Sequence, residues 1–208
     1  NAAVVFSPEG IVWASTVEGS EDIDVSFRDY FQKAMEGRAV ISDVFQPLPL
    51  GGTELMVAYV APVLAGTEVQ CVVGLMGHPN GVGAILDESD GFGGERSFIV
   101  LFDQYGNRIG SSLRKDFVLR PSGPIPPPAA ATMVAQGRFG PETATLLADV
   151  VPNPALFELA SAAELPADLA PFWEIDPANG EVNFSIARRL RTVPQTVVAR
   201  IPKSALFA

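Results

Sequence analysis

One arginine in the sequence is placed where it could bind an anion. Arg28 follows Phe27 and precedes Tyr30 at the start of a segment with helical hydrophobic spacing. A guanidinium offers a planar fork of donors that matches a carboxylate, and the amides of a nearby helix N-terminus favour the same anion. Arg28 could therefore hold a carboxylate ligand. It could equally lie on the surface and pair with Asp24 or Glu36, and the residues themselves leave both alternatives open.

The sequence contains no set of residues that fits an enzyme. A nucleophile elbow, a phosphate-binding glycine loop and a paired-histidine zinc helix are all missing. His78 is the single histidine, which excludes a catalytic triad and a multi-histidine metal site, and we expect it to be structural or on the surface. Residues 81–83 begin a dinucleotide-like string, but Leu86 stands where its third glycine belongs. We therefore expect no enzymatic activity, no cofactor and no metal.

Composition narrows the class of protein further. Of the 208 residues, 48% are hydrophobic and 18% are charged, which favours a buried core over disorder. The formal net charge of −10 argues against nucleic acid as a partner, because phosphate binding requires a basic surface. The single cysteine, Cys71, excludes an internal disulfide. The acidic residues between 87 and 95 do not have the spacing of a calcium loop, and we interpret them as a solvated linker.

An internal repeat organises the chain around Arg28. Residues 4–15 read as a strand, a turn containing Gly10, and a second strand. Residues 100–111 repeat this pattern, with glycine and serine in register. We therefore expect two units of similar fold, residues 1–85 and residues 86–208.

The helix that positions Arg28 is predicted from about Ser26 to Glu36. Its apolar residues recur at helical spacing and form one buried stripe: Phe27, Tyr30, Phe31, Ala34 and Met35. Ser26 is expected to cap the free amides, and Gly37 to end the helix. Strands are expected near Ala39–Phe45, Glu54–Val63 and Glu68–Met76.

The second half is predicted to contain the same kinds of element. Helices are expected near Pro141–Val151 and Ala155–Ala163, and strands near Glu181–Arg191 and Gln195–Ile201. The proline-rich stretch 121–131 is expected to be an extended surface loop. Both halves therefore indicate an α+β fold, with an antiparallel sheet flanked by helices in the manner of a PAS domain.

Three stretches of the first half carry a family resemblance. Residues 27–34, 40–45 and 58–63 resemble the membrane-distal half of double Cache domains, which are periplasmic or extracellular input regions of bacterial chemoreceptors and sensor histidine kinases. The likeness covers residues 4–76, and the hairpin at 98–112 resembles the membrane-proximal half.

This resemblance implies a fold and a cellular context. The fold would be two tandem PAS-like (Cache) subdomains, with residues 1–85 as the ligand-binding distal half and residues 86–208 as the proximal half. The chain would be the extracytoplasmic portion of an inner-membrane protein, anchored by helices outside this sequence. The full-length receptor could be a homodimer, and its output could be a kinase or a chemotaxis signal.

The resemblance also assigns ligand residues. In the family, an arginine followed two residues later by an aromatic residue clamps a ligand carboxylate, and Arg28 and Tyr30 match these positions. Members that sense amino acids hold the ligand's ammonium group with a tyrosine and acids from later segments. Phe45, Pro47 and Met76 stand at those positions here. Because a buried ammonium without an acceptor is costly, an α-amino acid is disfavoured.

The expected ligand is a small organic acid such as acetate, propionate, lactate or pyruvate. The resemblance implies pocket walls formed by Phe31, Phe45, Tyr59 and Met76 around the carboxylate clamp. Replacement of Arg28 by alanine is expected to abolish binding and to leave the fold intact, if the clamp is accessible to solvent. The alternative is a structural or partner-binding domain with a vestigial pocket.

Overall fold

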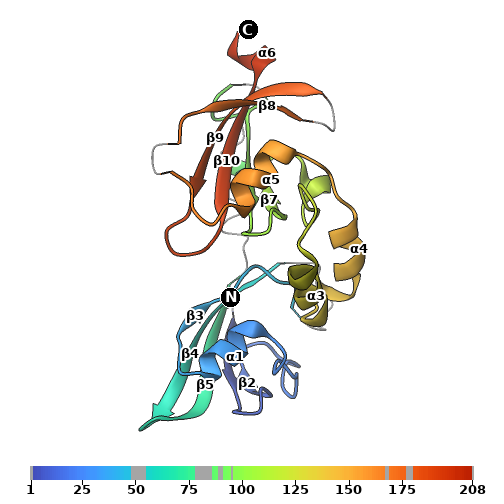
Figure 1. The fold of residues 1–208 in the computed structure, drawn as a ribbon. Coiled ribbons are helices and arrows are strands. Elements are labelled where there is room, and N and C mark those ends of the chain that lie inside the picture. Colours follow the sequence, from blue (N-terminus) through green and yellow to red (C-terminus); the bar gives the residue numbers. More distant parts are fainter. Residues whose placement is uncertain are drawn as a thin grey trace. The chain divides into compact units, whose positions relative to one another are not determined.

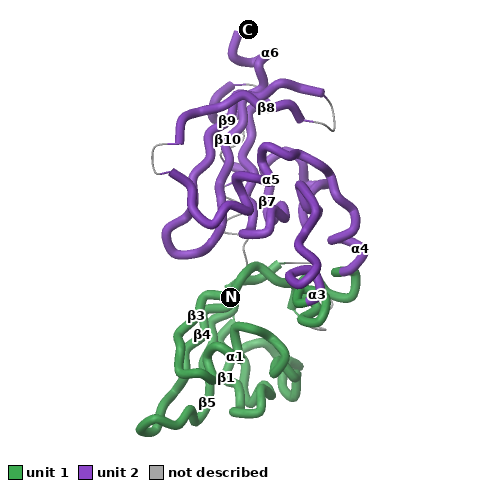
Figure 2. Tube along the Cα trace, viewed as in Figure 1, with its two compact units in different colours: residues 1–79, 132–143 green, residues 80–131, 144–208 purple. Residues whose placement is uncertain are grey.

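The chain folds into two compact units. The computed structural model describes residues 2–47, 55–77, 86–88, 91–94, 96–166, 169–176 and 180–207. Figure 2 shows the first unit, residues 1–79 with 132–143, and the second unit, residues 80–131 with 144–208. Residue 85 lies outside the described residues, so the predicted division between residues 85 and 86 stays a prediction. The inclusion of residues 132–143 in the first unit was not foreseen from the sequence.

The first unit is built on a five-stranded antiparallel sheet with helix α1 against one face (Figure 1). Its strand order is β2-β1-β5-β4-β3. The elements are β1 (Ala2–Phe6), β2 (Val12–Ser15), α1 (Asp29–Met35), β3 (Val40–Ile41), β4 (Val57–Ala65) and β5 (Glu68–Gly77). The inner face of the sheet and α1 enclose a core of apolar side chains.

The second unit has a sheet of the same size. Its strand order is β7-β6-β10-β9-β8. The strands are β6 (Phe98–Phe102), β7 (Arg108–Ser111), β8 (Phe172–Asp176), β9 (Glu181–Arg189) and β10 (Thr196–Pro202). Helices η1 (Lys115–Phe117), α5 (Pro154–Ser161) and α6 (Lys203–Leu206) lie within this unit. Helix η2 (Gly140–Glu142) lies in the first unit, and α3 (Pro127–Ala135) and α4 (Thr143–Ala148) cross the division between the two units. Helix α5 packs on the inner face of this sheet through Leu156 and Ala160, which gives the unit a core of its own.

The two sheets have one topology, and this confirms the repeat and the α+β fold class. In each sheet the first strand of the unit is paired with both the second and the last. The opening hairpins even share a bulge, between Val5 and Phe6 in the first and between Leu101 and Phe102 in the second. An extra residue at the same point of both hairpins gives both the same local twist.

Glycine is required at the turn of each hairpin. Gly10 has φ +91° and Gly106 has φ +79°, a region that L side chains rarely adopt. A Cβ on Gly10 would lie 2.6 Å from the Cα of Ser26, and a Cβ on Gly106 would lie 2.6 Å from the Phe157 ring. The glycines therefore let another segment cross each turn closely.

The extended loop predicted over residues 121–131 is wrong from Pro127 onward, because helix α3 begins there. Pro127 and Pro128 lie in its first turn. Amides in that turn have no acceptor within the helix, so the missing N–H groups cost little. The alanines that follow continue the helix. Proline in this stretch therefore marks where a helix begins.

Helix α1 is shorter than predicted, and the predicted cap is wrong. Arg28 occupies the N-cap position, and Ser26 lies outside the helix. The amide of Ser26 donates to the side-chain carboxylate of Asp24 at 2.8 Å, and this hydrogen bond closes a turn before the helix begins. Strand β3 is also shorter than predicted, since beyond it Phe45 forms only an isolated bridge with Met56. Strand β8 was not predicted.

No helix within the described ranges has the length and apolar character that crossing a membrane requires.

Candidate ligand-binding site

The local backbone turns Arg28 into the interior of the first unit. Its φ of −75° and ψ of 133° are extended, and its carbonyl accepts the amides of Phe31 and Gln32 at 3.1 Å. Upstream, the amide of Val25 donates to the carbonyl of Gly10 at 2.8 Å, which fixes the approach to the helix over the hairpin turn. The Arg28 side chain is only 3% exposed as a result.

Backbone carbonyls hold the guanidinium. Nη2 of Arg28 donates to the carbonyl of Gln46 at 3.0 Å, and Nη1 donates to the carbonyl of Gly137 at 3.4 Å. Nε is buried without a partner. The guanidinium carbon lies 5.0 Å from the centre of the Phe45 ring and 5.3 Å from that of Phe27. Burial lowers the pKa of Arg28, although an arginine remains charged at neutral pH.

The surface alternative for Arg28 is wrong. No carboxylate in the described part of the chain forms an ion pair with it. Asp24 accepts the amide of Ser26, and Glu36 pairs with the exposed Arg38. Arg28 is therefore a buried cation whose neighbours do not neutralise it.

A cavity of about 80 Å³ lies beside Arg28. Its walls are the inward-facing apolar residues of β1, β2 and β5 with side chains from the neighbouring loops. The polar residues that line it are Ser15, Ser20, Arg28 and Tyr30. Arg28 is the single charged residue among the lining residues, so the cavity is electrostatically suited to an anion.

Tyr30 supplies the second polar group of the cavity. Its side chain is buried, and its hydroxyl makes no hydrogen bond to any residue that the structure describes. Burial raises the pKa of Tyr30 to about 12. The phenol therefore stays protonated at neutral pH and can donate a hydrogen bond to an anion next to Arg28.

The structure brings four of the six predicted site residues together. Arg28, Tyr30, Phe45 and Met76 line the cavity. Phe31 is buried beside it but packs against Phe6, with ring centres 6.1 Å apart, and does not line it. The lining also includes Pro47, which the resemblance placed at an acid position, and Met56, which sequence reasoning missed.

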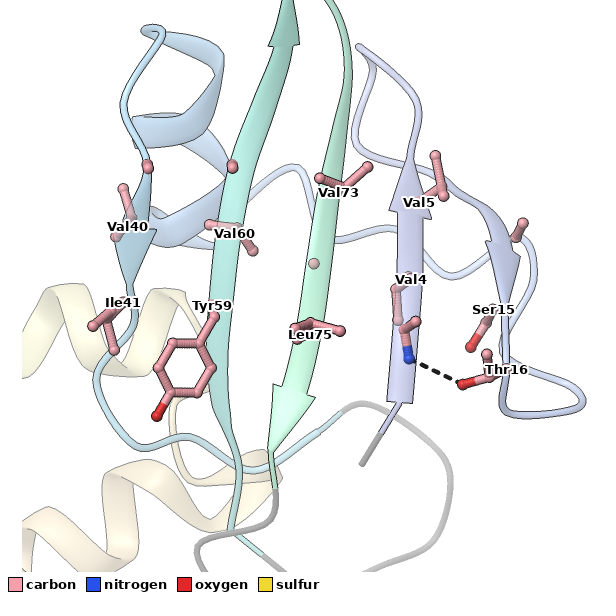
Figure 3. Close-up of a pocket in the computed structure, with 15 residues that line it drawn as sticks. Val4, Val5, Ser15, Thr16, Val40, Ile41, Tyr59, Val60, Val73 and Leu75 are labelled. Atoms are coloured by element: carbon pink, nitrogen blue, oxygen red, sulfur yellow. Dashed lines mark hydrogen bonds between the residues drawn. The ribbon is translucent and has the colours of Figure 1, made fainter.

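The prediction that Tyr59 forms a wall of this pocket is wrong. Strand β4 alternates its side chains, so Ala58 and Val60 face the core while Tyr59 faces outward and is 52% exposed. Figure 3 shows Tyr59 on the outer face of the sheet, next to its strand neighbours Ile41 and Leu75. A separate apolar groove of about 750 Å³ runs over this face.

Residues from the second half of the sequence complete the surroundings of Arg28. Gly137 supplies a carbonyl to it, as described above. Arg138 is buried, its Nε donates to the carbonyl of Val44 at 3.1 Å, and its own carbonyl accepts the amide of Gln46 at 2.7 Å. No sequence signal predicted these contacts, because more than 90 residues separate the partners.

The second unit has an ion cluster where the first has its cavity. Ala2 pairs with Met76 in the first sheet, and Phe98 pairs with Arg200 at the same register in the second. Arg200 is buried, and its Nη2 lies 2.5 Å from Glu174 and its Nη1 3.1 Å from Asp176. Asp176 of this cluster also lines a cavity of about 300 Å³, together with Arg96, Phe98 and Arg114, so charged side chains take the place of the apolar lining of the first unit.

Some predicted features lie outside the described residues. These are His78, residues 81–83, Asp90 and Glu95.

Solved structures share the fold of this chain. No protein-family model and no curated protein sequence matches it. The sensor domain of the V. cholerae histidine kinase DctB aligns with a TM-score of 0.67 at 14% identity, over 97% of this chain and 72% of that one. The periplasmic domain of RsbU from Chlamydia trachomatis aligns with a TM-score of 0.64 at 10% identity, over 99% and 71%.

A chemoreceptor is similar as well. The ligand-binding domain of Pseudomonas fluorescens CtaA, solved with L-alanine, aligns with a TM-score of 0.58 at 9% identity, over 100% of this chain and 74% of that one. The chain thus has the fold of these sensor domains, which confirms the tandem PAS-like (Cache) architecture that the sequence predicts.

Proposed function

We propose that this chain is the extracytoplasmic ligand-binding region of a transmembrane chemoreceptor or sensor histidine kinase, and that its first unit binds a small carboxylate. The observation that carries this proposal is the buried, un-neutralised Arg28 at the cavity. The chain has the fold of sensor domains from both a histidine kinase and a chemoreceptor, which supports the proposed role in transmembrane signalling. In the second unit Arg200 is paired with Glu174 and Asp176 beside a cavity with charged walls, whereas no described carboxylate neutralises Arg28, which favours the first unit as the ligand site.

The polar groups of the cavity favour a carboxylate. Arg28 lines the cavity and uses two of its five N–H donors for backbone carbonyls, so its hydrogen-bonding capacity is not exhausted. Tyr30 adds a protonated hydroxyl. Charge-assisted hydrogen bonds of this kind are about twice as strong as neutral ones, and burial strengthens them further.

The same cavity disfavours an α-amino acid, although the CtaA domain was solved with L-alanine. An ammonium group would need an anionic or acceptor partner, and none of the described residues that line the cavity is acidic. Ser15 and Ser20 are neutral, and both already bond to Val17. A buried ammonium without a partner costs several kcal/mol.

The volume favours a short acid. The cavity volume of about 80 Å³ is well below the roughly 300–1,000 Å³ of pockets that hold drug-sized ligands. Acetate and propionate suit this space best, and lactate and pyruvate come next.

Calorimetric titration tests the proposal. Acetate, propionate, lactate, pyruvate and L-alanine are titrated into the wild-type chain, Arg28→Lys and Arg38→Ala. We expect at least one short acid to bind the wild type and Arg38→Ala equally, because Arg38 is exposed and distant from the cavity lining. Arg28→Lys should bind more weakly, since an ammonium cannot replace the bidentate fork.

Two results would contradict this function. Binding of L-alanine without any response to the four acids would assign the cavity to amino acids. No measurable binding of any of the five compounds would favour the alternative, a structural or partner-binding domain with a vestigial pocket.

A further inference from the structure

We propose that residues 137–139, from the second half of the sequence, complete the carboxylate site of the first unit, with Arg138 as its positioning residue. This inference rests on the proposed function for its ligand.

The first step is the orientation of the Arg28 fork. Helix α3 ends at Ala135, and Gly137 follows with φ +52° while its amide donates to the carbonyl of Val134 at 3.0 Å. This left-handed turn directs the Gly137 carbonyl to Nη1 of Arg28. Together with the Gln46 carbonyl on Nη2, it fixes two corners of the planar group, while Nε is buried without a partner. A fork held in advance loses less conformational entropy when a carboxylate arrives.

The second step concerns the stretch 43–46, which contacts the Arg28 guanidinium. Arg138 holds the stretch 43–46 at three points, since Nε donates to Val44 and the carbonyl accepts from Gln46, while Nη1 lies 3.6 Å from the Asp43 carboxylate. This stretch carries the Gln46 carbonyl and the Phe45 ring, and both contact Arg28. Arg138 therefore acts on the ligand through other groups, because it does not line the cavity itself.

The third step follows from reciprocity. If the segment 132–143 helps to organise the ligand site, ligand binding must stabilise that segment by the same coupling free energy. Both ends of this segment continue directly into the second unit. Ligand binding in the cavity would therefore stabilise a segment that continues into the second unit at both ends.

The test combines binding with hydrogen exchange on the full chain. Acetate, propionate, lactate and pyruvate are titrated into the wild type, Arg138→Ala, Arg138→Lys and the control Arg38→Ala. Loss of an orienting partner typically weakens binding by about 10- to 100-fold. We expect Arg138→Ala to raise Kd at least about tenfold, Arg138→Lys to recover part of that loss, and Arg38→Ala to match the wild type.

Hydrogen exchange reports the coupling in the unmutated protein. With the tightest of the four acids at saturation, amides in 137–143 should exchange several times more slowly than in its absence. Binding with unchanged exchange in 137–143, or unchanged Kd in both Arg138 variants, would overturn the inference and leave the proposed function intact.

A further hydrogen-exchange measurement tests the inference without a ligand. Arg28→Lys should speed exchange in 137–143, because it removes the donor to Gly137. If no acid binds the wild type, the proposed function fails, and this measurement still decides whether the segment is coupled to Arg28. Unchanged exchange there overturns the inference.

Discussion

Arg28 combines a structural role with its proposed binding role. It is 3% exposed, and it donates hydrogen bonds to two backbone carbonyls. The sequence-based expectation that its removal leaves the fold intact assumed a solvent-accessible side chain, and the burial of Arg28 contradicts that assumption. Binding measurements on an alanine variant therefore require a parallel measurement of stability.

Arg28→Ala is expected to lower the free energy of unfolding by about 1–3 kcal/mol, because it removes two hydrogen bonds from a buried charged donor to the carbonyls of Gln46 and Gly137. Urea denaturation measures the change. The matched control is Arg38→Ala, which removes an exposed arginine paired with Glu36 and should stay within about 0.5 kcal/mol of the wild type. Equal stability of the two variants would show that the carbonyls do not depend on Arg28.

Tyr30 gives a prediction about alkaline pH. Burial raises its pKa from 10.0 to about 12, so the folded state holds the phenol proton more tightly than the unfolded state. This contribution to stability is complete below pH 10 and is lost as the pH rises toward 12.

Tyr30→Phe lacks this contribution at every pH. The free energy of unfolding of the variant, relative to that of the wild type, should therefore rise by roughly 2–3 kcal/mol between pH 10 and 12. This difference should stay constant between pH 7 and 9. Urea denaturation of both proteins across this range measures the difference. Stability curves that stay parallel throughout would mean that the phenol titrates alike in both states.

Single residues were predictable where local pattern and family resemblance coincided. Arg28 and Tyr30 are neighbours in sequence and both line the cavity. Tyr59 was misplaced because it lies in an apolar run in which the alternation of faces is hard to assign. Arg138 was out of reach, since its role consists of contacts with residues 43–46, far away in sequence.

The hairpin turn is the element that directs the chain toward Arg28. Gly10→Ala would combine a strained φ of +91° with a Cβ 2.6 Å from Ser26. Gly19→Ala is the matched control, because its φ of +77° is similar but nothing lies within 4 Å of its Cβ. The control should cost about 1–2 kcal/mol from strain alone, and Gly10→Ala about 1–3 kcal/mol more from overpacking. Thermal and urea denaturation measure both, and equal losses would show that Ser26 can move away freely.

Elements with a strong local signal were the ones that sequence reasoning placed. The two hairpins could be predicted from the sequence because glycine and serine recur in register. In the structure both hairpins also have a bulge at the same point. Strand β8 gave no such signal, since it is a short edge strand paired with β9 alone. Helix α3 was missed because proline was interpreted only as a helix breaker, while Pro127 stands in a first turn.

At the scale of the whole molecule, the two units share one fold but differ in the polar groups of their interiors. The first unit has a cavity with one buried cation, and the second unit has the ion cluster of Arg200, Glu174 and Asp176 next to a cavity with charged walls. Each unit also has a separate apolar core. A change in the second core should therefore alter stability without altering the ligand site.

Glu174→Gln tests this separation. Glu174 accepts hydrogen bonds from Arg200 at 2.5 and 2.8 Å and from Asn153 at 2.9 Å, all of them buried. Loss of its charge leaves Arg200 with Asp176 alone, and breaking a buried ion pair typically costs 3–5 kcal/mol. The control, Glu181→Gln, weakens a pair with the exposed Arg96, which is worth at most about 1 kcal/mol.

Denaturation of both variants should show this contrast in stability. Calorimetric titration well below the melting temperature should give the wild-type Kd for the bound acid in both, because no residue that lines the cavity belongs to the second unit. A raised Kd in Glu174→Gln alone, with the first unit still folded, would show that the ion cluster and the ligand site are coupled. The second unit would then take part in binding and could not be treated as an independent core.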